Sequence, residues 1–350
     1  MMNRLGADRL FGLMNGLNRA PLILGYHRVV EDFDEMSRSS IPSMLITTRT
    51  LEEHLDWVAR RYRFTTLDEI GARLESGEPF TERLAAVTFD DGYADIYENA
   101  FPLLSRKGIP ATVFVVTDLI GRDTLQIHDR LYLEILRTRQ GHPTALSDDP
   151  LRTTRALLSS MPQNSLRELL DLLETERDEP EEDGVALRCL DWEMLRRMHR
   201  AGFTIGSHSR THAMLVLENP SKIRDEVEGS LETLEAHLGI QVQHFAYPDG
   251  QFNARTVEAV KTAGYRFAYG ICPHGDPQSP LLTIRRRVLW ENTCLDGHHR
   301  FSPSLMSCVI NAVFDPFAPC RRAHGDPLEA IRERFTPAGN TTGRPAGGLA

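Results

Sequence analysis

The sequence lacks the features that mark disulfide-rich secreted domains, nucleic-acid binders and integral membrane proteins. Its five cysteines are an odd number without a Cys-x-x-Cys pair, which indicates neither a disulfide framework nor a cysteine zinc site and favours a reducing compartment. Basic residues are in deficit, with a formal net charge of -9, and we therefore expect no nucleic-acid partner. No apolar stretch is long enough to cross a bilayer.

The first 20 residues also lack the uninterrupted apolar core of a secretory signal, because Arg4, Asp8, Arg9 and Arg19 break it up. We therefore expect a cytoplasmic protein. Apolar side chains recur at helical spacing in this segment, which predicts an amphipathic N-terminal helix over residues 1–20. Packing of that helix on the domain is the favoured interpretation, and peripheral contact with the inner face of the membrane is the alternative.

What remains is an ordinary globular composition, with 41% hydrophobic and 25% charged residues in a chain of 350. Short apolar segments alternate with segments of helical periodicity, from a strand at 21–30 to a last strand at 282–289. This alternation predicts an α/β fold, an irregular (β/α) barrel of about seven strands within residues 21–300. Residues 301–350 form a C-terminal extension, and 336–350 has the composition of a disordered tail.

The alternation fails between residues 121 and 190, which predicts a helical insertion over 121–190. Two interpretations stay open for it, a lid or wall of the substrate site and a helical decoration without a role in the chemistry. His128 and Asp129 in this segment have side chains of the ligand type. No spacing connects them with the candidate site residues that follow.

A short buried strand at 86–89 ends in two adjacent carboxylates, Asp90 and Asp91, followed by Gly92 and Tyr93. The carboxyl ends of strands are where α/β proteins place their chemistry. Alone, the pair fits a solvated Asp-Gly turn better than an active site.

A second polar stretch contains His208 and His212 directly after an apolar segment. Two histidines four residues apart can point the same way on a helical turn, a spacing that lets two imidazoles bind one metal ion. A third ligand from Asp91 would complete a set of two histidines and one carboxylate, with positions left open for water and substrate. Alone, such a pair of histidines is more often an ordinary surface feature.

A third polar turn, Pro248-Asp249-Gly250, follows an apolar strand at 242–246. In this order, TFDDGY, SHSRTH and FAYPDG resemble the motifs of the polysaccharide deacetylase family, also called the NodB-homology family or carbohydrate esterase family four. The resemblance extends from Leu22 to Leu289 with a long insert in the middle. Three motifs in the family's order are specific, whereas any one of them would be weak.

The resemblance implies a role for each matching position. Asp90 would be the general base, and the backbone N–H of Asp249 would help to stabilise an oxyanion. A divalent metal, for which zinc suits the donor set, would be held by Asp91, His208 and His212.

The chain departs from the family pattern in two places, and the first concerns the residue that orients the base. The family's third motif usually contains an arginine that orients the base, and Phe245-Ala246-Tyr247 contains none. Arg286, in the run Arg285-Arg286-Arg287 of a neighbouring predicted strand, is the candidate for that role. Three arginines on a solvated edge are an equally good interpretation of this run.

The family's late Leu-x-His motif, which supplies the general acid, is absent after Leu289. His27, at the end of the first strand, is the candidate for the general acid. The first and last strands of a closed barrel are neighbours. A strand moved from the C-terminus to the N-terminus therefore keeps its place in the site while the sequence is permuted. The chain resembles, in this respect, some family members that act on poly-N-acetylglucosamine, which are permuted in this way and have a Tyr-His pair near the start. A loop-capping role for His27 and donation by His298 or His299 are the alternatives.

The activity that follows from the resemblance is metal-dependent hydrolysis of N-acetyl groups from a polysaccharide, oligosaccharide or glycolipid that contains N-acetylhexosamine. The expected partner is accordingly an N-acetylated glycan. A NodB-like glycan-binding protein with impaired catalysis is one alternative, and another metal-dependent C–N amide hydrolase on the same fold is the second.

Overall fold

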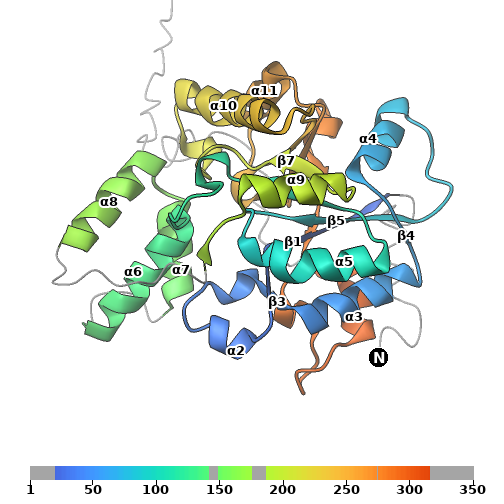
Figure 1. The fold of residues 1–350 in the computed structure, drawn as a ribbon, viewed down its shortest axis with the longest axis horizontal. Helices are drawn as coiled ribbons and strands as arrows, with labels where there is room; N and C mark the ends of the chain where they lie inside the picture. The colour runs from blue at the N-terminus through green and yellow to red at the C-terminus, as the bar shows by residue number, and fades with distance from the viewer. Residues whose placement is uncertain (1–19, 142–148, 176–186, 274, 316–350) are drawn as a thin grey trace, which may run out of the picture.

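The computed structural model describes residues 20–141, 149–175, 187–273 and 275–315. Its centre is a sheet in which every strand pairs with its neighbours in parallel (Figure 1). Along the sheet the order is β9-β8-β7-β6-β5-β1. The bounds of these strands are β1 Leu22–Tyr26, β5 Leu84–Phe89, β6 Ala111–Val115, β7 Thr204–Ser207, β8 His244–Ala246 and β9 Phe267–Gly270.

One short stretch closes this sheet into a barrel. The strand β10, Ile284–Arg285, pairs with β9, and β11, Arg287–Val288, pairs with β1 at the other end of the sheet. Arg286 lies between the two. The single strand expected at 282–289 is therefore two strands of two residues each, because each end of the stretch finds a different partner. The expected irregular barrel of about seven strands is confirmed.

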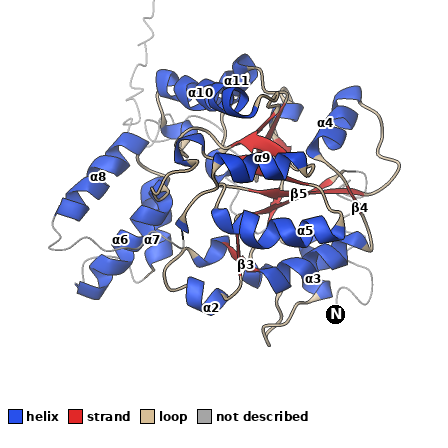
Figure 2. Ribbon diagram, in the orientation of Figure 1, coloured by secondary structure: helices blue, strands red, loops and turns tan. Residues whose placement is uncertain are grey.

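Helices follow the strands and surround the barrel (Figures 1 and 2). Side-chain caps start most of them, for example Thr66 before α4 and Asn219 before α10, where each accepts a hydrogen bond from the backbone N–H three residues on. Their bounds are α3 Thr48–Ala59, α4 Leu67–Ser76, α5 Phe101–Lys107, α9 Trp192–Arg200, α10 Pro220–Leu238 and α11 Ala254–Ala263. Figure 1 shows α10 and α11 side by side, with α3 and α5 on the opposite side of the sheet.

Smaller elements complete the described part of the fold. A second, two-stranded parallel sheet consists of β2 and β3, and β4 adds to the edge of β5. A π-helical segment, Ile96–Ala100, leads into α5. The bounds of the others are β2 Arg28–Val30, β3 Leu45–Thr47, β4 Arg63–Phe64, α2 Phe33–Met36 and α12 Pro303–Ile310.

Alternation along the strands determines which side chains face the barrel interior. Leu22, Leu24 and Tyr26 of β1 belong to the core between the sheet and its outer helices, whereas Ile23 belongs to a separate interior cluster. In the same register Ala86 of β5 and Phe114 of β6 face inward. The side chains at alternate positions toward the carboxyl ends of the strands therefore converge at one mouth of the barrel.

The helix α4 closes the other end of the barrel. Its Leu67 and Ile70 pack into the interior cluster, and Gly71 lies so close to Phe267 that a Cβ there would come within 2.6 Å of the ring. The amino ends of the strands are thus sealed by apolar side chains.

The insertion has a small core of its own. Its helices are α6 Ile127–Gly141, α7 Pro150–Leu158 and α8 Gln163–Thr175. Ile127, Leu131 and Ile135 pack there against Leu166 and Leu170. In Figure 1 these helices extend from one side of the barrel.

Several expectations lie outside the described residues: the helix at 1–20, except for its last residue, and the tail at 336–350. In the part of the chain that is described, no helix is both long and apolar enough to cross a membrane.

Candidate active site

Three strand ends bring the candidate residues to one mouth of the barrel. His27 follows β1, Asp90 follows β5 and His208 follows β7, each at the next position of the inward-facing register. Because parallel strands end at the same edge of a sheet, these side chains meet although they are far apart in sequence.

The adjacent carboxylates of Asp90 and Asp91 have different surroundings, because the backbone turns sharply between them. Asp90 extends β5 and donates its N–H to the carbonyl of Tyr26 at 2.9 Å. Asp91 and Gly92 then adopt left-handed conformations, with φ of 68° and 70°. A Cβ on Gly92 would also lie 2.9 Å from Cγ1 of Val115, so glycine is required here for space as well as for conformation.

Arg286 is the partner of Asp90. Its Nη1 and Nη2 donate to the two carboxylate oxygens at 2.6 and 2.7 Å, and Nη1 also donates to the Thr88 hydroxyl at 3.1 Å. Both side chains of the pair are buried. Burial alone would raise the pKa of Asp90, but Arg286 and His208 outweigh it and lower the pKa to about 2. Asp90 is therefore held as a carboxylate in one fixed orientation.

Asp91, His208 and His212 form a second cluster. The Asp91 Oδ1 lies 3.5 Å from Nε2 of His208 and 3.3 Å from Nε2 of His212, and neither Asp91 oxygen has a hydrogen-bond partner among the described residues. Burial, reinforced by Asp90 and Asp129, raises the pKa of Asp91 well above its ordinary value. A buried carboxylate without partners is costly in the absence of a cation.

The donor atoms of this cluster fit a divalent cation. One ligand atom from each residue lies within 4.8 Å of the others. The Nδ1 of His208 lies 2.8 Å from the carbonyl of Ala246, which leaves Nε2 unprotonated as a ligand atom. Burial lowers the pKa of His208. Burial and the neighbouring His208 and His128 lower the pKa of His212 well below its ordinary value. Both imidazoles are therefore neutral, as metal ligands must be.

The two histidines do not lie on a helical turn, and that expectation is wrong. They lie in a loop between β7 and the short helix η7, Leu215–Leu217, in which Ser209 and His212 have φ of 67° and 57°. The buried carboxylate of Glu226 accepts hydrogen bonds from the backbone N–H groups of Arg210 and Thr211 at 2.9 and 2.8 Å. Side-chain bonding to the loop backbone replaces the helix.

His27 faces the same mouth. Its Nδ1 is buried and has no partner among the described residues. Burial lowers the pKa of His27 to about 4, an effect that Asp90 opposes and His208 and Arg286 reinforce. The rival donors, His298 and His299, are exposed in a turn whose backbone N–H groups bond to Asp296.

Asp249 belongs to the turn of the third motif, η8, Pro248–Gly250, with φ of 52°. Its side chain is exposed at the mouth and accepts a hydrogen bond from Gln251 Nε2 at 2.6 Å. The backbone N–H of Asp249 has no acceptor among the described residues. The charge of Asp249 also contributes to the raised pKa of Asp91, after burial, Asp90 and Asp129.

Sequence reasoning missed the residues that the insertion brings to the site. Gln126 donates through Nε2 to the backbone carbonyl of Asp91 at 3.0 Å. The ring of His128 lies edge-on to that of His212, with centroids 4.9 Å apart. Tyr93, next to the carboxylate pair, joins His128 and Asp129 by hydrogen bonds. The ligand-type side chains of His128 and Asp129 were the signal in the sequence that could have pointed to the site, but only the fold shows that these residues lie beside it.

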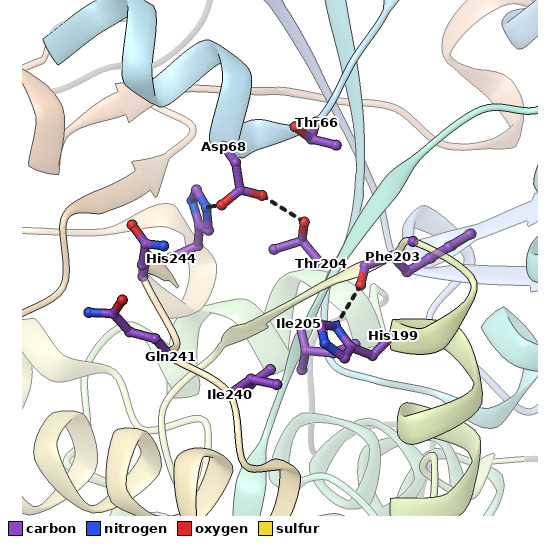
Figure 3. A pocket seen from close by; sticks show the side chains of 11 residues that line it. Thr66, Asp68, His199, Phe203, Thr204, Ile205, Ile240, Gln241 and His244 are labelled. Carbon is purple, nitrogen blue, oxygen red and sulfur yellow. Dashed lines mark hydrogen bonds and ion pairs between the residues drawn. The ribbon is translucent and has the colours of Figure 1, made fainter. Parts of the chain in front are cut away.

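A separate cavity of about 230 Å³ lies at the opposite end of the barrel (Figure 3). There His244 Nε2 lies 3.1 Å from Asp68 Oδ1, and Thr204 donates to Asp68 Oδ2 at 3.0 Å. None of the candidate catalytic or metal-binding residues lines this cavity. The candidate residues that follow the strands β1, β5 and β7 lie at the other mouth.

Comparisons with known proteins indicate the family of this chain. The family model for polysaccharide deacetylases matches residues 77–268, more than half of the chain. The chain is 36% identical over 108 residues to the poly-beta-1,6-N-acetyl-D-glucosamine N-deacetylase of Staphylococcus epidermidis, which covers 29% of this chain and 37% of that protein. It is 22% identical over 245 residues to YxkH of Bacillus subtilis, by its name a candidate polysaccharide deacetylase, covering 70% and 62%. The chain thus spans less than two thirds of the length of these relatives.

Two solved structures share the fold. The Streptococcus pyogenes deacetylase PplD, solved with acetate, superposes with a TM-score of 0.56 at 18% identity, covering 83% of this chain and 98% of that one. IcaB from Ammonifex degensii superposes with a TM-score of 0.56 at 19% identity, covering 84% and 97%. The matched family model, which includes the carboxylate pair and both histidines, shows that this chain belongs to the polysaccharide deacetylase family.

Proposed function

We propose that this protein is a metal-dependent deacetylase that hydrolyses N-acetyl groups of a glycan containing N-acetylhexosamine and releases acetate. The observation that carries the proposal is the contrast within one carboxylate pair. Asp90 is held by Arg286 and has both oxygens bonded, whereas the neighbouring Asp91 is buried without partners beside two neutral histidines. One position suits a proton acceptor and the other suits a metal ligand.

Asp91, His208 and His212 would hold the divalent cation, and zinc suits one carboxylate and two imidazoles. When bound, such a cation polarises the acetamide carbonyl and lowers the pKa of a water molecule in the site. Three protein ligands leave positions open for that water and for substrate, as catalytic zinc sites require.

The chain's own residues supply the remaining chemistry. Asp90, oriented by Arg286, takes the proton of the attacking water. The free backbone N–H of Asp249 donates to the oxyanion that develops from the acetyl carbonyl.

The leaving nitrogen needs a proton, and His27 is the proposed donor. With a pKa lowered to about 4 by burial, its imidazole is neutral near pH 7 and must first receive a proton. Asp90 has the lower pKa of the two, about 2, so a proton that enters the site resides on His27 rather than on Asp90 and is there available to the leaving nitrogen.

The family and the relatives support the proposed substrate class. A neutral or cationic glycan also suits a chain of net charge -9 better than an acidic polymer. A glycan-binding protein without activity is disfavoured, because binding alone gives no reason to fix one carboxylate, Asp90, beside a set of three metal-ligand side chains. Membrane contact through residues 1–20 stays a prediction.

The test is acetate release from a panel of N-acetylated glycans, including β-1,6- and β-1,4-linked N-acetylglucosamine oligomers. The full chain should release acetate, lose this activity on chelation and regain it with zinc. The metal content of the same sample should be measured. Glycan binding without acetate release in the metal-loaded protein would favour the binding-protein alternative, and release from simple amides only would favour a different amide hydrolase.

A further inference from the structure

The start of the helical insertion contacts the metal-ligand cluster directly. Gln126, fully buried, bonds to the backbone carbonyl of Asp91, and the next turn brings the buried side chains of His128 and Asp129 to Tyr93. The end of the insertion returns to the same place, where Leu190 donates to the carbonyl of Gly92 at 2.8 Å. The insertion is therefore attached to the site at both of its ends.

Hydrogen-bond accounting fixes the proton of His128. The Tyr93 hydroxyl donates its single proton to Oδ2 of Asp129 at 2.6 Å. It lies 2.8 Å from Nε2 of His128 and can only accept there, so Nε2 carries a proton. In the neutral imidazole the other ring nitrogen, Nδ1, is then an acceptor.

That acceptor has no partner in the chain. The Nδ1 of His128 is buried without a hydrogen bond among the described residues. Because the two ring nitrogens point in different directions, Nδ1 is turned away from Tyr93. The ring itself lies against His212, at an interplanar angle of 65°, and the charge of Asp249 acts on it. His128 thus adjoins a proposed metal ligand, His212, and lies within electrostatic range of Asp249 in the turn of the third motif.

We propose that His128 is a substrate-binding residue, whose Nδ1 accepts a hydrogen bond from a hydroxyl group of the N-acetylhexosamine. Tyr93 and Asp129 are positioning residues that hold the acceptor tautomer. Hydroxyl groups are the donors in which a glycan is rich, and a buried acceptor rejects analogues that lack the donor. The inference rests on the proposed deacetylase function and gives the insertion a part in specificity.

Two other roles fit His128 less well. The set of atoms that can share one metal ion comprises Asp91, His208 and His212 and does not include His128. Proton donation is also unsuitable, because the Nε2 proton is already given to Tyr93. An acceptor for substrate is the function that remains.

The test pairs substitutions with modified substrates. Short N-acetylglucosamine oligomers in which a single hydroxyl group is replaced by hydrogen are compared with the parent oligomer, using wild type, His128→Ala and His128→Asn. For one hydroxyl, wild type should lose roughly tenfold in kcat/KM, whereas His128→Ala should be insensitive to its removal. His128→Asn, which keeps a polar atom near the position of Nδ1, should retain part of the discrimination.

Tyr93→Phe tests the positioning role. It should keep metal content close to wild type, lower the Tm because Asp129 and His128 lose a buried hydrogen-bond partner, and lose discrimination for the same hydroxyl. ¹⁵N NMR of labelled histidine should show loss of the Nε2–H tautomer of His128. Tyr97→Phe is the matched control, since Tyr97 stacks on Phe101 and its hydroxyl meets Arg197 on the surface.

The outcomes separate the two proposals. If wild type releases acetate from no glycan, the deacetylase proposal fails, and the NMR measurement still reports on the hydrogen-bonded cluster. If wild type is active and the kcat/KM of His128→Ala is lower than that of wild type by the same factor on every analogue, the effects of the substitution and of the missing hydroxyl are additive. Substrate binding by His128 is then overturned. Unchanged kcat/KM in His128→Ala would overturn it as well.

Discussion

Arg286 and Asp90 are 196 residues apart in the chain and form a buried, doubly hydrogen-bonded ion pair. The pair exists because residues 284–288 join the two ends of the sheet, which places Arg286 beside β5 at the point of closure. Its neighbours Arg285 and Arg287 both bond to Asp315 instead. The three arginines are therefore separable by experiment.

Replacing Arg286 by Met should lower kcat by roughly a hundredfold or more, because a misplaced base loses its alignment with the reacting water. It should also lower the free energy of unfolding by about 3–5 kcal/mol, since Asp90 would remain buried as an unpaired charge. Arg286→Lys should have a kcat and a free energy of unfolding between those of wild type and Arg286→Met, because lysine keeps the charge but not the paired donors. Steady-state kinetics and urea unfolding measure the two effects.

Arg287→Met is the control for this substitution, since it removes an arginine of the same run that pairs with the partly buried Asp315. It should leave kcat within a few fold of wild type. Equal losses in both variants would mean that Arg286 has no special relation to the base.

How much of this site is readable from the sequence depends on the range of the interactions involved. The strand that ends in Asp90 and Asp91 is a local pattern, and the barrel follows from the alternation of such patterns. The loop with His208 and His212 defeats local reasoning, because a distant carboxylate, Glu226, holds its backbone. Spacing allowed the two imidazoles to share a metal ion, and the resemblance favoured that interpretation, but spacing gave the wrong local structure.

Long-range contacts account for the rest of the difference. From the sequence, contact between Arg286 and the base is one of two interpretations of the arginine run. Closure of the sheet places Arg286 against Asp90. His128 had no spacing that tied it to the site, because α6 reaches the histidine loop through tertiary packing alone. Sequence pattern thus predicts the residues on strand ends, and misses those that are delivered by an insertion.

The metal set should separate cleanly from the base. Replacing Asp91, His208 or His212 by Ala should remove bound zinc and activity together, because two protein ligands hold the ion too weakly. Asp90→Asn should keep zinc and lose nearly all turnover, since an amide cannot accept the proton. Elemental analysis of the purified variants checks this, and the reverse pattern for Asp90 and Asp91 would exchange their roles.

Asp91→Asn should have opposite effects on stability with and without metal. Burial raises the pKa of Asp91 above its unfolded value, so in metal-free protein this group lowers stability as pH rises from the unfolded pKa toward the folded one. In chelator at pH 8, Asp91→Asn should therefore have a higher Tm than wild type, and the advantage should shrink toward pH 4.

Zinc should reverse that order. A ligand at a hundred times its Kd adds about 2.7 kcal/mol to the stability of the folded state, and only wild type should show this gain. Differential scanning calorimetry with chelator and with zinc makes the comparison. A Tm of Asp91→Asn that rises with zinc as much as that of wild type would contradict the assignment of Asp91 as a ligand.

The acid limb of the rate profile should follow metal occupancy and not the titration of the base. The pKa of Asp90 is lowered to about 2, so Asp90 stays ionised throughout the accessible range. The pKa of Asp91 is raised, so protons compete with the cation for this ligand as pH falls. The acid midpoint of kcat/KM should move to lower pH when zinc is raised from micromolar to submillimolar concentration. An acid midpoint independent of zinc would argue against this competition.

His27→Ala should keep the fold and the metal but lose roughly two to four orders of magnitude in kcat on an N-acetyl substrate, the usual effect of removing a positioned acid. An activated acetyl ester, whose leaving group needs no proton, should be affected much less, because attack by water relies on Asp90 and not on His27. The ratio of the two activities therefore isolates proton donation from binding and from damage to the site. His298→Ala and His299→Ala are the controls, and both should behave as wild type because these side chains are exposed in a turn. If His27→Ala hydrolyses both substrates at the wild-type rate while one of the controls loses only the amide reaction, that histidine is the acid and the permuted arrangement is wrong.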